Sequence, residues 1–290
     1  MAESGLIIVD KPAEWTSHDV VGKLRRLAGT RRVGHAGTLD PMATGVLVIG
    51  VEKATRLLGH LALTEKVYRA TMRLGVTTST DDAEGEVLGT ASAAHVEDEA
   101  VLAGVAPMRG PIMQVPPQVS AIKVNGERAY KRARAGEDVQ LAARPVTIHE
   151  FEVTAIRRHD DVVDVDATVR CSSGTYIRSL ARDLGDGLGV GGHLTYLRRT
   201  RVGPYDLSMA RTIEELAQEC VVLPIAEAVA AAFPRRDVTA EEARVVSHGG
   251  RLRAAGLGEG PIGVFDPDGA LLALVEEVNG TAKPVAVFVG

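Results

Sequence analysis

The chain has 290 residues, of which 45% are hydrophobic and 3% aromatic, and its formal net charge is -5. This length predicts one large domain or two, and the lack of any run of 18 apolar residues argues against a membrane span. The short apolar run at 6–9 does not resemble a signal peptide. Two cysteines, Cys171 and Cys220, form no disulfide framework, so we expect a cytoplasmic protein with both thiols free and buried.

Charge is unevenly distributed along the chain. Residues 20–35 hold five Lys or Arg and no acid, and residues 192–201 hold three Arg and no acid. Residues 81–99 hold seven acids and neither Lys nor Arg. A surface polarised in this way can bind RNA although the total charge is acidic. For any one cluster, solvated surface charge is the alternative.

The first predicted elements are a strand over 6–9, a helix over 18–27 capped by Ser17, a strand from residue 46 and a helix over about 53–60. Strict alternation at 68–74 and 162–170 predicts two further strands. A helix is then predicted from helical spacing of four apolar residues. These residues are Ile177, Leu180, Ala181 and Leu184.

The end of the chain has a different pattern. A boundary is predicted near residues 233–236, after which two apolar runs, 261–265 and 270–275, flank an Asp-Pro-Asp-Gly turn. This pattern predicts a hairpin, and residues 285–289 predict a last strand. Strands interrupted by helices indicate an α/β (α+β) fold with a mixed sheet and a small strand-rich C-terminal domain.

One loop stands out chemically. Residues 31–45 read RRVGHAGTLDPMATG and contain a single carboxylate, Asp40, with glycines on both sides. A carboxylate held on such a loop, next to an apolar strand, suits nucleophilic catalysis. The alternative is that Asp40 caps a helix whose first residue is Pro41. His35 has no nearby residue at metal-ligand spacing, so no metal site is predicted.

The spacing from Gly34 to Gly45 resembles the catalytic motif of the TruB family, the bacterial tRNA pseudouridine-55 synthases. The resemblance implies that Asp40 is the nucleophile and that His35 fills the space left by the flipped nucleotide. Residues 65–70, EKVYRA, resemble the second motif of the family. There the tyrosine that matches Tyr68 packs against the target base and is proposed to assist proton removal. A buried core tyrosine is the alternative.

Arg178 lies in the first turn of its predicted helix, where the helix dipole disfavours a cation. None of its helical neighbours is acidic, so its anionic partner must lie elsewhere in the chain, unless it is solvated or forms an ordinary surface ion pair. In the TruB family the matching arginine pairs with the catalytic aspartate. The resemblance therefore implies that Arg178 lowers the pKa of Asp40.

Residues 114–144 begin with prolines and are rich in Lys and Arg, and they resemble the thumb insertion that clamps the T arm of tRNA. A solvated loop is the alternative. Residues 193–200 resemble a further motif, whose leucine lines the uracil pocket, and residues 10–12 resemble the N-terminal motif. The substrate contacts implied in this way are Lys11, His35, Tyr176, Leu197, Lys123, Arg128, Lys131 and Arg132.

The resemblance implies a pseudouridine synthase fold with a mixed, mainly antiparallel sheet. We expect a catalytic domain over 1–233, with the thumb-like insertion at about 114–144, and a small PUA-like domain over 234–290. The reaction is redox-neutral and needs no metal or organic cofactor. The expected partner is the T arm of tRNA, without a membrane or an obligate protein partner, and the expected state is a monomer.

Three questions remain open at the level of sequence. Asp40 can attack C6 of the base or C1′ of the ribose, or act through a glycal route. A non-catalytic RNA-binding protein with this fold is one rival, against which the set of Asp40, Tyr68 and Arg178 argues. A guide-RNA-dependent synthase subunit is the other, against which the thumb-like segment argues.

Overall fold

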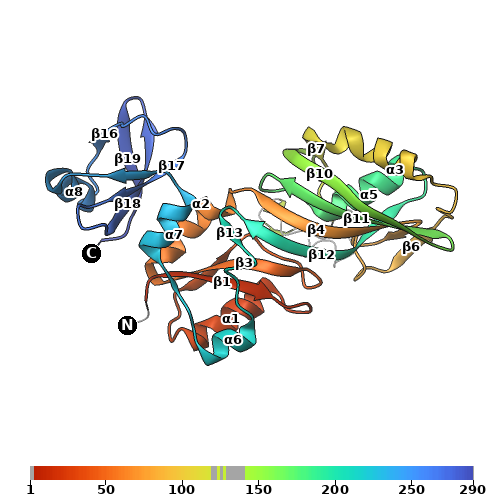
Figure 1. Ribbon diagram of the computed structural model, residues 1–290, viewed down its shortest axis with the longest axis horizontal. Helices are drawn as coiled ribbons and strands as arrows, with labels where there is room; N and C mark the ends of the chain where they lie inside the picture. Colours follow the sequence, from red (N-terminus) through yellow and green to blue (C-terminus); the bar gives the residue numbers. More distant parts are fainter. Residues whose placement is uncertain (1–2, 119–122, 125–126, 129–140, 290) are drawn as a thin grey trace. The chain divides into compact units, whose positions relative to one another are not determined.

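The computed structural model describes residues 3–118, 123–124, 127–128 and 141–289. Contacts divide the chain into two compact units. The first consists of Met1–Pro41, Gly45–Thr64 and Val202–Gly290, and the second of Met42–Thr44 and Glu65–Arg201. Both units combine strands with a few helices (Figure 1), which confirms the predicted fold class. The predicted domain division near residue 233 does not follow these units and stays a prediction.

The first unit contains an antiparallel sheet in which β1 lies between β14 and β3, and β2 pairs with β3. The residues of β1 and β3 are almost all buried, which is why both strands read as apolar runs. The elements are β1 (Gly5–Lys11), α1 (Ser17–Leu27), β2 (Val33–Ala36), β3 (Thr44–Val51), the 3₁₀ helix η1 (Glu52–Leu57), α2 (Leu58–Ala62), β13 (Tyr205–Asp206), α6 (Ile213–Gln218), β14 (Leu223–Pro224) and α7 (Ile225–Ala232).

Helix α1 is capped one residue earlier than predicted. The Thr16 hydroxyl accepts from the backbone N–H of Asp19 (3.1 Å), and the Asp19 carboxylate accepts from the backbone N–H of Thr16 (2.9 Å), which is a capping box. The side-chain and backbone hydrogen bonds from Thr16 lower the pKa of Asp19. The prediction that Ser17 caps this helix is wrong, because the Ser17 side chain is buried and forms hydrogen bonds with the backbone of Leu39 instead.

The C-terminal part of the first unit is a five-stranded sheet in the order β15-β17-β18-β19-β16. The predicted hairpin is present as β17 and β18, while the last strand begins at Thr281, before the predicted residue 285. Phe265, Leu274 and Phe288 pack in one apolar cluster with Val46 and Val229. The elements are β15 (Arg235–Asp237), α8 (Ala240–Ser247), β16 (Leu252–Arg253), β17 (Pro261–Phe265), β18 (Leu271–Val278) and β19 (Thr281–Val287).

The second unit contains the strands β12-β4-β11-β10-β7 in this spatial order. The predicted alternation of β4 is confirmed, because Tyr68, Ala70, Met72 and Leu74 are all buried. The elements are β4 (Lys66–Leu74), β5 (Val76–Thr78), β6 (Val87–Thr90), α3 (Asp98–Val105), η2 (Ala106–Met108), β7 (Gly110–Gln114), β8 (Lys123–Val124), β9 (Glu127–Arg128), β10 (Arg144–His159), β11 (Val162–Cys171), α5 (Ile177–Gly187) and β12 (Gly192–Val202).

Both cysteines are free; Cys171 is buried as predicted, whereas Cys220 is only partly buried. Burial raises the pKa of the Cys171 thiol to about 11, so it is protonated at neutral pH. No helix among the described residues is long and apolar enough to span a membrane.

An ion pair joins β4 to β11 and allows a test of this sheet. Asp164 lies opposite Arg73 in the register and accepts two hydrogen bonds from its guanidinium, at 2.7 and 2.8 Å. These hydrogen bonds hold the pKa of Asp164 below its usual value. Arg73 is partly exposed, so we expect Asp164→Asn to lower the free energy of unfolding by only about 1 kcal/mol.

The expected pH dependence follows from the lowered pKa. The contribution of Asp164 is complete above the pKa of the unfolded chain and is lost as the pH falls through the lower pKa of the folded protein. Urea unfolding of wild type and Asp164→Asn at pH 7 and near pH 3 measures this difference. If the difference in free energy of unfolding between the two proteins were the same at both pH values, the lowered pKa of Asp164 would not be supported.

Candidate active-site residues

The loop with Asp40 connects two paired strands of the first unit. It starts after β2 ends at Ala36 and runs to β3, and Gly37 and Gly45 adopt positive φ angles of 74° and 99°, a conformation that favours glycine. No helix begins at Asp40, because residues 41–42 form a turn that leads directly into β3. The helix-cap alternative for Asp40 is therefore wrong, and the predicted glycine-bounded loop before a strand is confirmed.

Side chains from the N-terminal segment anchor the loop on both sides of Asp40. The Ser17 hydroxyl accepts from the backbone N–H of Leu39 (2.9 Å) and lies 3.2 Å from its carbonyl oxygen. On the other side, the carbonyl of Pro41 accepts from the backbone N–H of Glu14 (2.9 Å). Asp40 itself is half-buried. These contacts hold the backbone on both sides of Asp40.

Lys11 belongs to the same anchor. Its side chain is fully buried, and the ammonium donates to the carbonyls of Pro12 (2.8 Å), Trp15 (2.5 Å) and Pro41 (3.2 Å). Lys11 thus contacts the backbone next to Asp40, and its predicted contact with the substrate stays a prediction.

His35 lies on β2, opposite Ile49 of β3, a few residues before Asp40. Its ring meets the ring of His18 edge to face, with centroids 5.5 Å apart and an interplanar angle of 78°. It is therefore positioned on the same element that leads into the Asp40 loop.

In the second unit, Tyr68 and Leu197 lie on one face of the sheet. A surface pocket of about 600 Å³ on the opposite face is lined by Arg69, Thr71 and Tyr196, among others. Side chains alternate along a strand, so the neighbours of these residues on β4 and β12 point the other way. Tyr68 is 8% exposed and Leu197 is 7% exposed.

Two buried cations accompany this face. Lys66 is 5% exposed and Arg199 is 1% exposed. Burial, followed by the charge of Arg199, lowers the pKa of Lys66 to about 8. Buried charges in proteins are normally paired. The sequence analysis counted Arg199 among the three arginines of 192–201 and gave Lys66 no separate role. The sequence does hold a signal for both. Lys66 lies two residues before Tyr68, and Arg199 lies two residues after Leu197. Because side chains alternate along a strand, each cation shares the buried face of its strand with that neighbour.

Arg178 has a partner that the sequence analysis missed. Its guanidinium donates from Nη1 to the carbonyl of Thr80 (2.8 Å), and the same nitrogen is 3.4 Å from Oδ2 of Asp82. Both side chains are almost fully buried. Solvation and an ordinary surface ion pair are therefore excluded for Arg178. The predicted pairing with Asp40 is a separate matter and stays a prediction.

A second ion pair supports the first. Arg182, one turn further along α5, donates to Asp81 (2.8 Å) and to Asp183 (2.8 Å). Burial raises the pKa of Asp81 although Arg182 opposes this shift. The backbone of Asp81 and Ala83 also bonds Leu194 of β12. The acidic start of the 81–99 run thus contacts both α5 and β12: its carboxylates pair with arginines of α5, and its backbone bonds β12. It is not solvated surface charge.

The start of α5 is held by a polar side chain from β7. The amide of Gln114 donates to the carbonyl of Tyr176 (3.0 Å) and accepts from its backbone N–H (2.8 Å). Tyr176 is the residue before the helix and is partly exposed. Its predicted substrate contact stays a prediction, but its backbone is held by both hydrogen bonds to Gln114.

The thumb-like segment lies mostly outside the described residues, which exclude 119–122, 125–126 and 129–140. Lys131 and Arg132 are among the excluded positions. Lys123 and Arg128 are backbone partners in the register of the short β8–β9 pair. Within the described part of the chain, no group of three or more His, Cys, Asp or Glu residues is arranged to hold a metal ion.

Three family models match the chain in succession. They are described as TruB family pseudouridylate synthase (N terminal domain), over residues 25–177, tRNA pseudouridylate synthase B C-terminal domain, over 178–229, and tRNA pseudouridine synthase II, C terminal, over 233–289. Asp40 and Tyr68 fall in the first match and Arg178 in the second.

Similar curated proteins cover the whole chain. The tRNA pseudouridine synthase B of Thermobifida fusca is 67% identical over 99% of both chains. The protein of the same name from Streptomyces coelicolor is 62% identical over 98% of this chain and 97% of its own.

Solved structures share the fold. The chain matches a protein in the crystal structure of a Cbf5-Nop10-Gar1 complex with a TM-score of 0.73 and 27% identity, over 99% of this chain and 84% of that one. A chain from an H/ACA RNP bound to a substrate RNA containing 2′-deoxyuridine also has a TM-score of 0.73, at 24% identity, over 99% of this chain and 85% of that one.

Proposed function

The chain belongs to the TruB family and is a tRNA pseudouridine synthase that isomerises uridine 55 in the T loop, and we propose that Asp40 is its nucleophile. The main evidence for this activity is the 67% identity, over 99% of the chain, to a tRNA pseudouridine synthase B. The anchored loop around Asp40 supports the proposal for the nucleophile, because Ser17, Glu14 and Lys11 hold its neighbours on both sides.

The reaction breaks the bond between N1 of uracil and C1′ of ribose and forms a bond between C5 and C1′, while C5 loses its proton to solvent and N1 gains one. Uridine 55 is buried in folded tRNA, so it must flip out to reach Asp40. His35 fills the space that the nucleotide leaves. The attack of Asp40 on C6 or on C1′, and the glycal route, all lead to this product.

Tyr68 and Arg178 assist this chemistry in our proposal. Tyr68 packs against the uracil ring, next to Leu197, and helps to remove the proton from C5. Arg178 favours the ionised form of Asp40. The burial of both side chains, at 8% and 5% exposure, supports roles in a desolvated pocket, where charges act more strongly than in water.

The enzyme acts alone, as a monomer in the cytoplasm, on the T arm of tRNA. The Cbf5 chain is described in a complex with Nop10 and Gar1, whereas the full-length relatives of this chain carry the name of a tRNA enzyme. A guide-RNA-dependent role would require a partner for turnover, which makes the two proposals distinguishable.

The test uses purified chain alone and an unmodified tRNA transcript labelled with tritium at C5 of uridine. We expect release of about one equivalent of label per tRNA, since one uridine loses its C5 proton. A transcript with cytidine at position 55 is the control and should release none. Release that requires an added protein or guide RNA would overturn the stand-alone proposal, and RNA binding without release would favour the non-catalytic rival.

A further inference from the structure

A surface pocket of the second unit lies on the face of the sheet that points away from Tyr68. It has a volume of about 600 Å³ and crosses the neighbouring strands β12, β4, β11 and β10 (Figure 1). This volume is within the range of about 300–1,000 Å³ that is usual for small-molecule sites. The residues that shape this pocket, hereafter the sheet pocket, include Arg69, Thr71, Arg157, Asp166, Thr168 and Tyr196.

Short side chains occupy the centre of the sheet pocket and longer ones its edges. Thr71 of β4 and Asp166 of β11 lie opposite each other in the register, and both side chains are short. The Thr195 hydroxyl donates to the carbonyl of Thr71 (3.2 Å), which places Tyr196 of β12 beside this centre. Arg157 of β10 lines the other edge. The hollow thus follows from the order of side-chain lengths across four paired strands.

Strand β10 has a β-bulge at the edge of the sheet pocket. Val153 pairs with Ala167 and Ala155 pairs with Asp166, so Thr154 is an extra residue in the register. A bulge bends its strand and re-aims a side chain, and bulges are frequent next to functional sites. The extra residue, Thr154, is itself part of the lining. The irregularity of the sheet therefore coincides with the hollow.

One cation of the sheet pocket is neutralised and one is not. The guanidinium of Arg157 donates to both carboxylate oxygens of Asp166, and Asp166 also accepts from the Thr71 hydroxyl (2.7 Å). Arg69 is exposed, and its side chain has no hydrogen bond or ion pair within the described part of the chain. The sheet pocket thus offers one uncompensated positive charge, which favours a ligand with an anionic group.

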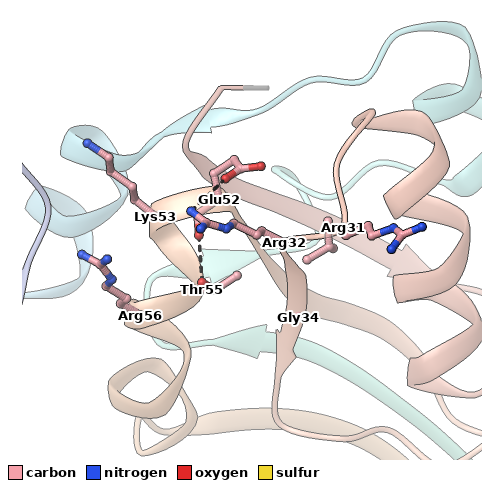
Figure 2. Close-up of a pocket in the computed structure, with 8 residues that line it drawn as sticks. Arg31, Arg32, Gly34, Glu52, Lys53, Thr55 and Arg56 are labelled. Carbon is pink, nitrogen blue, oxygen red and sulfur yellow. Dashed lines mark hydrogen bonds and ion pairs between the residues drawn. The ribbon is translucent and has the colours of Figure 1, made fainter. Parts of the chain in front are cut away.

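Tyr196 adds an aromatic surface to this charge. It is 43% exposed, and exposed aromatic rings on a sheet are surfaces on which nucleic-acid bases stack. Figure 2 shows a pocket of the first unit that differs in this respect, because it holds several cations and no aromatic ring: Arg31, Arg32, Lys53 and Arg56. A ring together with one free guanidinium matches a ligand that carries both a base and a phosphate.

The surface around the sheet pocket favours a single nucleotide over a strand of RNA. Arg73 and Arg170 lie on the same exposed face, one beyond each end of the sheet pocket. Arg73 is paired with Asp164 (2.7 Å), and Arg170 is paired with Glu65 (3.1 Å). An RNA strand needs a row of cations to neutralise its successive phosphates. The cations next to Arg69 are already paired with acids, so only one phosphate is matched.

We propose that the sheet pocket binds a free nucleoside 5′-monophosphate, with its base against the ring of Tyr196 and its phosphate at Arg69. Arginine binds phosphate through paired, charge-assisted hydrogen bonds. The hydroxyls of Thr154 and Thr168 line the same hollow and are available to polar groups of the sugar or the base. The sheet pocket is on the face opposite Tyr68, so this ligand is additional to the RNA substrate.

The test is calorimetric titration of the full chain with AMP, in the absence of RNA. AMP is the probe because its purine differs from the uracil of the proposed catalytic pocket. We expect a Kd of about 1 mM or tighter. Arg69→Gln should weaken binding about tenfold, and Tyr196→Ala about fivefold or more. Tyr196→Phe keeps the ring and should bind AMP within about twofold of the wild type.

The matched control is Arg158→Gln, which removes a cation of β10 that is held by Asp98 and by the carbonyl of Val96. It should bind AMP like the wild type, and thermal unfolding checks that all variants fold. Adenosine and inorganic phosphate, tested singly, should each bind at least about tenfold more weakly than AMP, because each makes only part of the contacts.

Three results would overturn the proposal. The first is no binding of AMP at millimolar concentration. The second is binding that is unchanged in both Arg69→Gln and Tyr196→Ala, which would place the AMP elsewhere. The third is an unstructured adenylate hexamer that binds at least about tenfold more tightly than AMP and loses this advantage in Arg69→Gln, which would assign the sheet pocket to an RNA strand. The assay involves no turnover, so its failure is distinguishable from failure of the pseudouridine assay.

Discussion

Asp40→Asn is expected to reduce the release of C5 label by more than about a thousandfold, because an amide cannot act as the nucleophile. The affinity for tRNA should change by less than about twofold, since RNA affinity comes mainly from contacts of cations with phosphates. Asparagine keeps the size of the side chain, and Ser17 and Lys11 still hold the loop through backbone atoms of Leu39 and Pro41. Single-turnover kinetics and binding to unmodified tRNA measure the two quantities separately.

The control for Asp40→Asn is Glu14→Gln, which removes an acid from the segment that anchors the same loop. The Glu14 side chain is exposed, and its bond to Pro41 uses only the backbone. Its turnover should match the wild type. Turnover of Asp40→Asn within tenfold of the wild type would remove Asp40 from the role of nucleophile.

Arg178→Met is expected to have two separate effects. It leaves the buried carboxylate of Asp82 without its cation, which should lower the free energy of unfolding by about 3 kcal/mol or more. It should also slow turnover by about a hundredfold or more. If Arg178 favours the ionised form of Asp40, its loss raises the pKa of Asp40, and the acidic limb of the pH–rate profile moves to higher pH.

Two further variants separate structure from chemistry. Asp82→Asn breaks the same ion pair but keeps the cation, so it should destabilise the fold and leave the acidic limb in place. Arg178→Lys keeps a charge at this position. It should therefore be more stable to unfolding than Arg178→Met, and the acidic limb of its pH–rate profile should lie close to that of the wild type. An acidic limb that moves equally in Asp82→Asn and Arg178→Met would show that Arg178 acts only through the fold.

Local patterns predicted much of the secondary structure. The alternation in 68–74 and 162–170 became β4 and β11, paired with each other, and the turn residues at 266–269 became the β17–β18 hairpin. These signals are local because the side-chain period of a strand and the composition of a turn are set by neighbouring residues. The error at Ser17 has a tertiary cause, since Thr16 and Ser17 are both good caps and only contact with Leu39 distinguishes them.

The partners of buried charges were not predictable in the same way. The carbonyl of Thr80 and the carboxylate of Asp82 lie nearly a hundred positions from Arg178 in the sequence. The acidic run at 81–99 suggested only a polarised surface, yet Asp82 is buried and Asp81 is partly buried against Arg182. Charge counts along the chain do not distinguish an acid that meets solvent from one that meets an arginine of another element.

By itself, the sequence determined the family, the reaction and the residues that carry its motifs, because a long ordered string such as the one around Asp40 rarely arises by chance. It also determined which strands form, because their period is local. Only the tertiary structure decided that Lys11 supports the Asp40 loop and that Asp82 neutralises Arg178. Each of these depends on distances between segments far apart in the chain, which long-range packing sets and local pattern does not record.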